Sequence, residues 1–199
     1  MRDVTGDHYF STEPATSADR RTVAFSVEGR DYSLSSSAGV FSADRLDSGT
    51  AVLLRKAELP GPETTGVLLD LGCGYGPITC VLASRATTAT VWAVDVNARA
   101  RELTTENAQR LGLADRVRVA APDEVPDDLS IAQLWSNPPI RVGKDELHAM
   151  LRRWLPGWRR TAWRGWWWPG ISAATRSSAG SSSRAGGSSG MPARRATGC

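Results

Sequence analysis

The chain of 199 residues has no apolar run of the roughly 20 residues that a membrane-spanning helix requires. Its start, Met1-Arg2-Asp3-Val4, is not followed by the apolar segment of a secretory signal peptide. We therefore expect a cytoplasmic protein with no membrane partner.

Cysteine and histidine are scarce. Cys73, Cys80 and Cys199 are odd in number and have no paired spacing, which argues against a disulfide framework and against a zinc motif. His8 and His148 have no further ligand residues around them in a metal-binding pattern. We expect no metal site, and we interpret Cys73 as a small turn residue and Cys80 as a helix packing residue.

Acidic residues are absent from the tail, residues 158–199, which holds seven Arg. Residues 1–157 hold 17 basic and 21 acidic residues, so the net charge of +3 comes from the tail alone. The basic character of the whole chain is therefore no indication that residues 1–157 bind nucleic acid.

The tail also lacks an apolar pattern typical of strands or helices. Ser, Gly, Ala, Arg and Trp fill 34 of its 42 positions, and Ile171 is its only aliphatic β-branched residue. A disordered Ser/Gly tail or a basic interaction arm would explain most of this composition. Neither explains Trp166-Trp167-Trp168, because disordered tails have few aromatic residues.

A shift of one base changes the character of the tail. Valine codons GTG-GTG read one base late become TGG-TGG, which encode Trp-Trp. With permissible codon choices, residues 157–185 decode as (R/W/G)LAPDGVAWLVVARNLGGDSLQRWLVEQG, which contains a turn, a strand AWLVV and an amphipathic helix. We hypothesise a one-base frameshift near Pro156-Gly157, either a sequencing error or a pseudogene, which resequencing the DNA around codon 156 would test.

The most informative motif is VLLDLGCGYG, at Val67–Gly76. A short apolar strand closes on an acid, and a glycine-rich turn leads to Pro77, where a helix can begin. Its three glycines lack Cβ and can adopt positive φ, so a ligand can approach the backbone and the free N–H groups there. The Gly-x-Gly-x-Gly spacing departs from the Gly-x-Gly-x-x-Gly of dinucleotide enzymes.

Strand and helix patterns alternate from Val67 onward. The expected strands start at Val67 and at Thr90–Val94, Val117–Ala120 and Ile131–Trp135, and the expected helices are Pro77–Ser84, Ala98–Leu111 and Asp145–Leu155. Repeated strand–helix units predict an α/β fold, a doubly wound and mostly parallel sheet with its ligand site at the carboxyl ends of the strands.

A small extension precedes these units. Thr22–Glu28 alternates as a strand, Gly29-Arg30-Asp31 is a turn signal, and Tyr32-Ser33-Leu34 completes a hairpin. A short apolar-periodic helix is expected over Ala51–Ala57.

Two acids follow the second and third core strands. Asp95 comes about 20 residues after the glycine turn, where an acid can accept hydrogen bonds from both hydroxyls of a ribose. Alternatively it caps the next helix, although Asn97 could do so instead. Asp123 could accept from an adenine amine, or it is a solvated loop acid.

The fourth core strand leads into Asn137-Pro138-Pro139. The side-chain oxygen of Asn137 and the backbone carbonyl of Pro138 can accept the two hydrogens of a planar exocyclic amine and favour a more tetrahedral nitrogen. Each proline fixes φ near about −65°, so the acceptors need little ordering. Taken alone, Asn-Pro-Pro is a common loop breaker.

These motifs together resemble a class I S-adenosylmethionine (SAM) methyltransferase, and more closely the bacterial rRNA guanine-N2 methyltransferases of the methyltransferase small domain type. The resemblance covers about three quarters of the chain, on His8-Tyr9-Phe10-Ser11, Gly39–Ser42, Asp44–Thr50, Leu69–Gly76, Asp95-Val96-Asn97, Asn107-Ala108 and Ser136–Lys144. It implies SAM as the cofactor, and ribosomal RNA or a ribosomal subunit as the partner.

With this resemblance, the candidate site has three parts. The catalytic candidates are Asn137, Pro138 and Pro139; the cofactor-binding candidates are Asp70, Gly72, Cys73, Gly74, Gly76, Asp95 and Asp123; and the substrate-binding candidates are Phe41, Ile140, Arg141 and Lys144. The resemblance implies that Phe41 and Asp44–Thr50 lie near the pocket. Arg141 and Lys144 would meet phosphate, or belong to an exposed charged loop.

We therefore expect three regions: an extension at residues 1–60, a SAM-binding core at 61–157 and an aberrant tail at 158–199. The expected reaction methylates guanine N2 of small-subunit rRNA. Adenine N6 or a protein glutamine amide is an alternative acceptor, and an inactive frameshifted remnant is an alternative of another class. Two departures from the family stand out: there is room for one domain copy where some members have two, and without a fifth strand the outer edge of the fourth strand would be unpaired.

Overall fold

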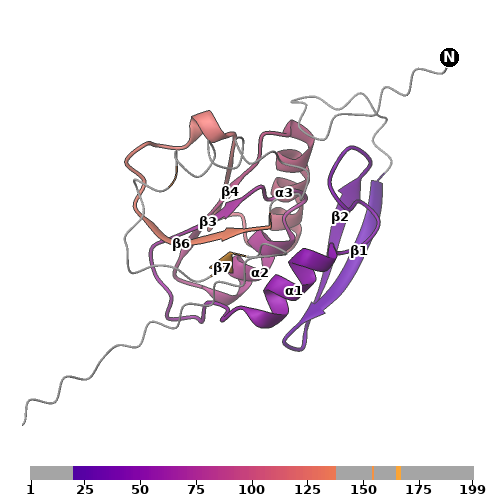
Figure 1. Cartoon of the computed structure of the whole chain (residues 1–199), viewed down its shortest axis with the longest axis horizontal. Coiled ribbons are helices and arrows are strands. Elements are labelled where there is room, and N and C mark those ends of the chain that lie inside the picture. The colour runs from indigo at the N-terminus through magenta and orange to yellow at the C-terminus, as the bar shows by residue number, and fades with distance from the viewer. Residues whose placement is uncertain (1–19, 138–153, 155–164, 167–199) are drawn as a thin grey trace, which may run out of the picture.

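The computed structural model describes residues 20–137, Trp154 and the strand Gly165–Trp166 (Figure 1). The elements in chain order are β1 (Arg20–Val27), β2 (Arg30–Ser37), α1 (Ser48–Lys56), β3 (Val67–Leu71), α2 (Pro77–Arg85), β4 (Thr90–Val94), α3 (Ala98–Arg110), β5 (Val117–Ala120), the 3-10 helix η1 (Pro122–Glu124), β6 (Ile131–Ser136) and β7 (Gly165–Trp166). The predicted α/β fold is confirmed, whereas the helix expected at Asp145–Leu155 lies outside the described residues apart from Trp154.

The main sheet has the order β5-β4-β3-β6-β7, with every neighbouring pair parallel. The chain builds outward from β3 through β4 to β5 and then returns to place β6 on the other side of β3. The carboxyl ends of β3 and β6 therefore lie side by side, with Leu71 opposite Ser136. This reversal of strand order is where open parallel sheets bind their ligands.

The tail contributes one short strand to the sheet. Gly165–Trp166 forms a short strand, β7, that pairs with Trp135 and Ser136, so the outer edge of β6 is paired at its carboxyl end. Pairing there satisfies backbone groups that an edge strand would otherwise leave open. β7 also falls within residues 164–168, which the shifted frame decodes as the strand AWLVV. The frameshift itself stays a hypothesis.

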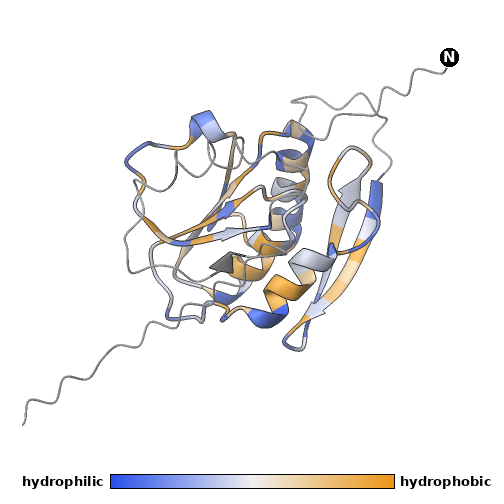
Figure 2. Cartoon of the chain, viewed as in Figure 1, coloured by the Kyte–Doolittle hydropathy of each residue, from blue (hydrophilic) through white to orange (hydrophobic). Residues whose placement is uncertain are grey.

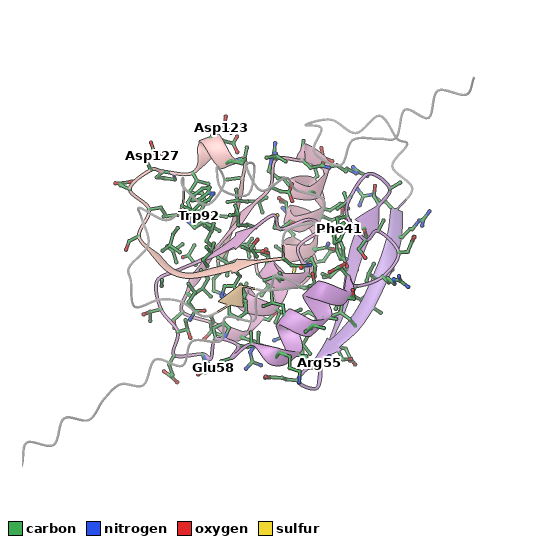
Figure 3. All side chains as sticks on the ribbon, viewed as in Figure 1. Phe41, Arg55, Glu58, Trp92, Asp123 and Asp127 are labelled. Atoms are coloured by element: carbon green, nitrogen blue, oxygen red, sulfur yellow. The ribbon has the colours of Figure 1, made fainter. Side chains whose placement is uncertain are left out.

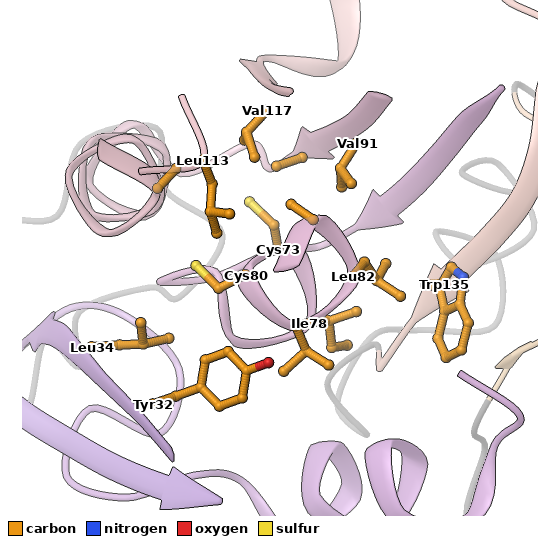
Figure 4. Close-up of a cluster of buried hydrophobic side chains, with 14 of the residues drawn as sticks. Tyr32, Leu34, Cys73, Ile78, Cys80, Leu82, Val91, Leu113, Val117 and Trp135 are labelled. Atoms are coloured by element: carbon orange, nitrogen blue, oxygen red, sulfur yellow. The ribbon is translucent and has the colours of Figure 1, made fainter. Parts of the chain in front are cut away.

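The elements stack in layers beside the sheet (Figure 1). Helices α2 and α3 pack against the sheet, the β1–β2 hairpin packs against α3, and α1 packs against α2. Apolar colour is concentrated in α1, α2 and the central strands, whereas η1 is hydrophilic (Figure 2). Tyr32 and Leu34 from the hairpin lie in the same buried cluster as Ile78, Leu82 and Trp135 (Figure 4). The extension thus shares one hydrophobic core with the residues that follow it.

A second, smaller cluster covers the other face of the sheet. It contains Leu69, Val94 and Ile131 from three adjacent strands, together with Trp154, whose side chain is buried. Burial on both faces accounts for the nearly continuous apolar runs of β3 and β4.

The turn of the hairpin differs from the sequence prediction by one residue. The turn consists of Glu28 and Gly29, with φ of 47° and 79°, and Arg30 and Asp31 already belong to β2. Positive φ at both positions defines a type I′ turn, whose twist matches that of the flanking strands. A geometric preference of the two strands, rather than turn propensity alone, therefore sets the loop.

Asn107 of α3 joins three parts of the fold. Its Oδ1 accepts from the backbone N–H of Ser35 at 2.7 Å, and its Nδ2 donates to the carbonyls of Ser35 and Tyr75, both at 2.8 Å. The side chain is 1% exposed. It therefore links the hairpin to the turn after β3.

We expect Asn107→Ala to lower the free energy of unfolding by about 2–4 kcal/mol, because it leaves buried backbone groups without partners. The exposed Gln109 on the same helix is the matched control, and Gln109→Ala should change stability by no more than about 0.5 kcal/mol. Urea unfolding measures both variants. Equal effects at the two positions would show that Asn107 does not link these segments.

Candidate active site

The glycine turn after β3 has the conformation that its sequence predicts. Gly72, Gly74 and Gly76 have φ of 77°, 59° and 90°. The N–H groups of Gly72 and Cys73 donate to the carbonyl of Val94 at 2.8 and 3.1 Å, which ties the turn to the end of β4. No atom lies within 4 Å of the position that a Cβ would take at Gly72 or Gly74, so this side of the turn is open.

Gly76 has a different role from the two glycines before it. A Cβ there would lie 2.9 Å from Oγ1 of Thr104 on α3, and Gly76 is the N-cap residue of α2. It allows close packing of the turn against a helix, as the third glycine of nucleotide-binding turns does. It does not line the pocket described below.

Asp70 is fully buried within β3. Its Oδ2 accepts from the N–H of Thr79 at 2.9 Å and from the Thr79 hydroxyl at 2.5 Å, whereas its Oδ1 has no partner among the described residues. Burial raises the pKa of Asp70 from 3.8 to about 7, against the opposing effect of the Thr79 hydrogen bonds. The carboxyl group thus ties the end of β3 to α2, and its second oxygen is buried.

This raised pKa makes stability depend on pH. Above pH 4 the unfolded chain ionises Asp70, but the folded chain keeps its proton until about pH 7, so folding loses stability as pH rises through this interval and levels off above it. The change amounts to a few kcal/mol, since each pKa unit corresponds to about 1.4 kcal/mol.

We therefore expect Asp70→Asn to flatten the fall in stability between pH 5 and pH 8, while its amide oxygen still accepts from Thr79. Urea unfolding of the ligand-free chain at the two pH values measures the difference. Asp115→Asn removes an exposed carboxylate and is the control, which should keep the fall. A slope unchanged by Asp70→Asn would contradict the assignment.

Asp95 lies directly after β4 and contacts the same turn. Its Oδ2 accepts from the N–H of Gly74 and its Oδ1 from the N–H of Asn97, both at 2.9 Å. The cap of α3 is Asn97, which accepts from the N–H groups of Arg99 and Ala100. Burial raises the pKa of Asp95, although the N–H groups of Asn97 and Gly74 lower it. Two of about four acceptor positions on the carboxylate remain for other donors.

A single pocket joins the glycine turn to the end of β6. Its lining residues come from the loop before α1, from α1, from the turn, from the start of α2 and from the segment after β6: Phe41, Ser42, Asp47, Thr50, Gly72, Cys73, Gly74, Tyr75, Pro77, Ile78 and Asn137. The chain thus brings Asn137 next to Gly72 and Gly74, as the sequence predicts, because β6 returns beside β3.

The amide of Asn137 is oriented by the N-terminus of α1. Its Nδ2 donates to Oδ2 of Asp47 at 2.7 Å and to Oγ1 of Thr50 at 2.9 Å. Asp47 is the N-cap residue of α1 and also accepts from the N–H of Thr50 at 3.0 Å. The Oδ1 of Asn137 has no partner among the described residues.

The other predicted site residues are placed in different ways. Phe41 lines the pocket, and Cys73 lies in it as a buried thiol whose pKa burial raises well above 9.0. Asp123 is exposed on η1, at the outer surface (Figure 3), and does not line the pocket. The remaining candidates, Pro138, Pro139, Ile140, Arg141 and Lys144, lie outside the described residues.

Sequence reasoning missed the individual roles of two lining residues. The sequence places Asp47 near the pocket but does not indicate its hydrogen bond to Asn137. The pattern Asp-Ser-Gly-Thr indicates only that Asp47 can cap a helix. The glycine motif marks Tyr75 only as a position within the turn. Its side chain is 2% exposed, its hydroxyl has no partner among the described residues, and burial raises its pKa so that it stays neutral.

The polar groups around the turn are of the kinds that SAM can bind. The open face of Gly72 and Gly74 leaves room beside the backbone, and Asp95, which accepts from the N–H of Gly74, has acceptor positions left for hydroxyls. Neither Asp70, which is fully buried, nor Asp95 lines the pocket. Within the part of the chain that the structure describes, no group of three His, Cys, Asp or Glu residues could hold a metal ion. None of the described helices is long and apolar enough to cross a membrane.

Three comparisons bear on this pocket. Residues 31–157 match the model of the methyltransferase small domain family. The uncharacterized Bacillus subtilis protein YbxB is 37% identical over 150 residues, which cover 74% of this chain and 73% of that protein. Ribosomal RNA small subunit methyltransferase C of Colwellia psychrerythraea is 35% identical over 119 residues, which cover 59% of this chain and 32% of that protein. The chain thus spans about a third of that methyltransferase.

Among solved structures, a 16S rRNA N2 methyltransferase of T. thermophilus in complex with AdoMet and guanosine has the same fold. It superposes with a TM-score of 0.56 at 22% identity, and the match covers 73% of this chain and 41% of that one.

Proposed function

This chain belongs to the methyltransferase small domain family, and from that premise we propose that it transfers a methyl group from SAM to guanine N2 of small-subunit ribosomal RNA. The family match confirms the predicted enzyme class, a SAM-dependent methyltransferase, and the predicted cofactor. The acceptor is the further step, and the named rRNA methyltransferases among its relatives support it. An rRNA substrate would place the enzyme in the cytoplasm.

The observation that carries the proposal is the shared pocket of Asn137 and the glycine turn. Gly72 and Gly74 line this pocket together with Asn137, whose amide oxygen has no partner among the described residues. Asp95 accepts from the N–H of Gly74 and Asp70 holds Thr79, so both stabilise the turn without lining the pocket. This arrangement suits a reaction in which an amine must be held in line with a methyl group, because placement supplies much of the rate.

SAM, when bound, supplies an electrophilic methyl group on a sulfonium: the amine nitrogen forms the new C–N bond, the C–S bond breaks with its electrons remaining on sulfur, and the amine proton passes to water. The protein holds the amine. Asn137 Oδ1 accepts one amine hydrogen, which draws the nitrogen lone pair out of conjugation with the ring. The proposed reaction needs no titrating base, since placement supplies much of the rate and the proton passes to water.

Methylation of adenine N6 or of a protein glutamine amide uses the same acceptor chemistry. The named relatives favour rRNA over both. We propose residues 138–144, outside the described part, as the substrate side of the pocket, with Arg141 and Lys144 meeting phosphate.

The test incubates the full chain, as printed and with the reading frame restored after Pro156, with SAM carrying a tritiated methyl group. Acceptors are rRNA and assembled small subunits from cells that lack the gene, an adenine-rich RNA without guanine, and a release-factor protein. Nucleoside mass spectrometry identifies the product. N2-methylguanosine in small-subunit rRNA is the expected result. Label found only in adenine or only in protein would show that guanine N2 is not the acceptor. No label in any acceptor would support the alternative that the chain is an inactive remnant.

A further inference from the structure

The side-chain amide of Asn137 is hydrogen-bonded to residues at the N-terminus of α1. Resting on the proposed function, we propose that Asp47 and Thr50 are positioning residues that fix the Asn137 amide in a single orientation, with its nitrogen toward α1 and its oxygen left for the target amine. The clamp, meaning Asp47, Gly49 and Thr50, comes from the extension that precedes the SAM-binding core.

The chemistry of Asp47 decides the orientation. An ionised carboxylate only accepts hydrogen bonds, whereas the amide of Asn137 has a donor end and an acceptor end of nearly equal shape. Its nitrogen lies 2.7 Å from Asp47 Oδ2, and its second N–H is directed to Thr50 Oγ1 at 2.9 Å. A flipped amide would place its oxygen against the carboxylate. Both N–H groups are therefore committed to α1.

The orientation matters because the target is itself a donor. An exocyclic amine presents two hydrogens, and an amide NH₂ facing it would set donors against donors. With Nδ2 held by α1, only Oδ1 is left to meet the amine. The clamp thus removes the amide conformer that would oppose binding.

Gly49 provides the space for this oxygen. A Cβ built at Gly49 would lie 2.6 Å from Asn137 Oδ1 and 2.9 Å from Asp47 Oδ2. Gly49 lies in the first turn of α1 and is not among the glycines with positive φ, so backbone geometry does not require it. Glycine is a poorer helix former than alanine. The close approach of the amide is therefore what requires glycine here.

Two substitutions separate positioning from folding. Gly49→Ala improves helix propensity but occupies the space beside Oδ1. Asp47→Asn keeps a good helix cap, since Asn caps as well as Asp, but can receive the amide in either orientation. Asp44→Asn is the matched control: it removes the same charge from the same loop, where Asp44 pairs with Arg21 and does not line the pocket.

We expect Gly49→Ala and Asp47→Asn to lower kcat for rRNA methylation by about 10–100-fold, with SAM affinity by calorimetry within about twofold, because a misplaced acceptor costs rate and not cofactor binding. Thermal unfolding should be unchanged or higher for Gly49→Ala. Asp44→Asn should keep its kcat. In a chain that already carries Asn137→Ala, adding Asp47→Asn should lower kcat no further. Wild-type kcat in both clamp variants would overturn the proposal.

A measurement without turnover keeps this test separate from that of the proposed function. In ¹⁵N-labelled full chain, the side-chain NH₂ signals of Asn137 are assigned by their loss in Asn137→Ala. Held by two acceptors, they should exchange slowly with water, and Asp47→Asn should speed the exchange while Asp44→Asn should not. Fast exchange in the unsubstituted chain would overturn the clamp even if rRNA is methylated. Slow exchange in a chain that methylates no acceptor would support the proposed positioning of Asn137 and contradict the proposed rRNA substrate.

Discussion

Replacing Asn137 with alanine is expected to slow methyl transfer by about 10²–10³-fold, the range seen when one pre-organised group is removed from a charge-stabilising site. The pocket joins Asn137 to the open face of Gly72 and Gly74, and the substitution removes the oxygen that we propose as the acceptor for the amine. Single-turnover kinetics with SAM and rRNA measure the step.

The cofactor contacts serve as the internal control. Asp70, Asp95 and the glycine turn make their hydrogen bonds without Asn137, so SAM affinity of the Asn137→Ala variant should stay within about threefold, as for an interaction made only in the transition state. Asp47 keeps its bond to the N–H of Thr50, and the fold should persist. A turnover rate within a few-fold of the unsubstituted chain would remove Asn137 from the mechanism.

The second large effect concerns the tail. A chain whose reading frame is restored after Pro156 is expected to bind SAM at least about 100-fold more tightly than the printed chain and to unfold at higher urea concentration. β7 has only two residues, so backbone pairing beside β6 is short, next to the strand that carries Asn137. A full strand and helix there would pair the open backbone groups along the edge of β6. They would also bury apolar surface, which offsets the conformational entropy that the chain loses on folding.

The matched control is a chain truncated after Gly157. If the printed tail stabilises neither the fold nor SAM binding, the truncated and printed chains should have the same SAM affinity by calorimetry. They should also have the same unfolding midpoint. Equal SAM affinity for the printed and restored chains would contradict the frameshift hypothesis. DNA sequence that confirms the printed frame, together with peptides from the Trp-rich tail, would refute its sequencing-error version.

Much of the fold was predictable from residues close in sequence. The strands at Thr90–Val94 and Val117–Ala120 have the predicted bounds, and α3 ends one residue before the prediction. Apolar runs of strand length and glycine at a turn are local signals, since they follow from burial and from φ. The hairpin turn was misplaced because its type depends on the twist of both strands.

The sequence by itself determined the alternation of strands and helices, the glycine turn and the polar residues at the strand ends, because these follow from a repeating local pattern. The tertiary structure decided the strand order that returns β6 beside β3 and brings Asn137 to the turn. Only the tertiary structure decided that Asp47 and Thr50 hold Asn137, that Gly76 packs against Thr104 and that Asp70 is fully buried. These pairings join residues far apart in the chain, and their partners are chosen by how the layers pack, which no local pattern of residues encodes.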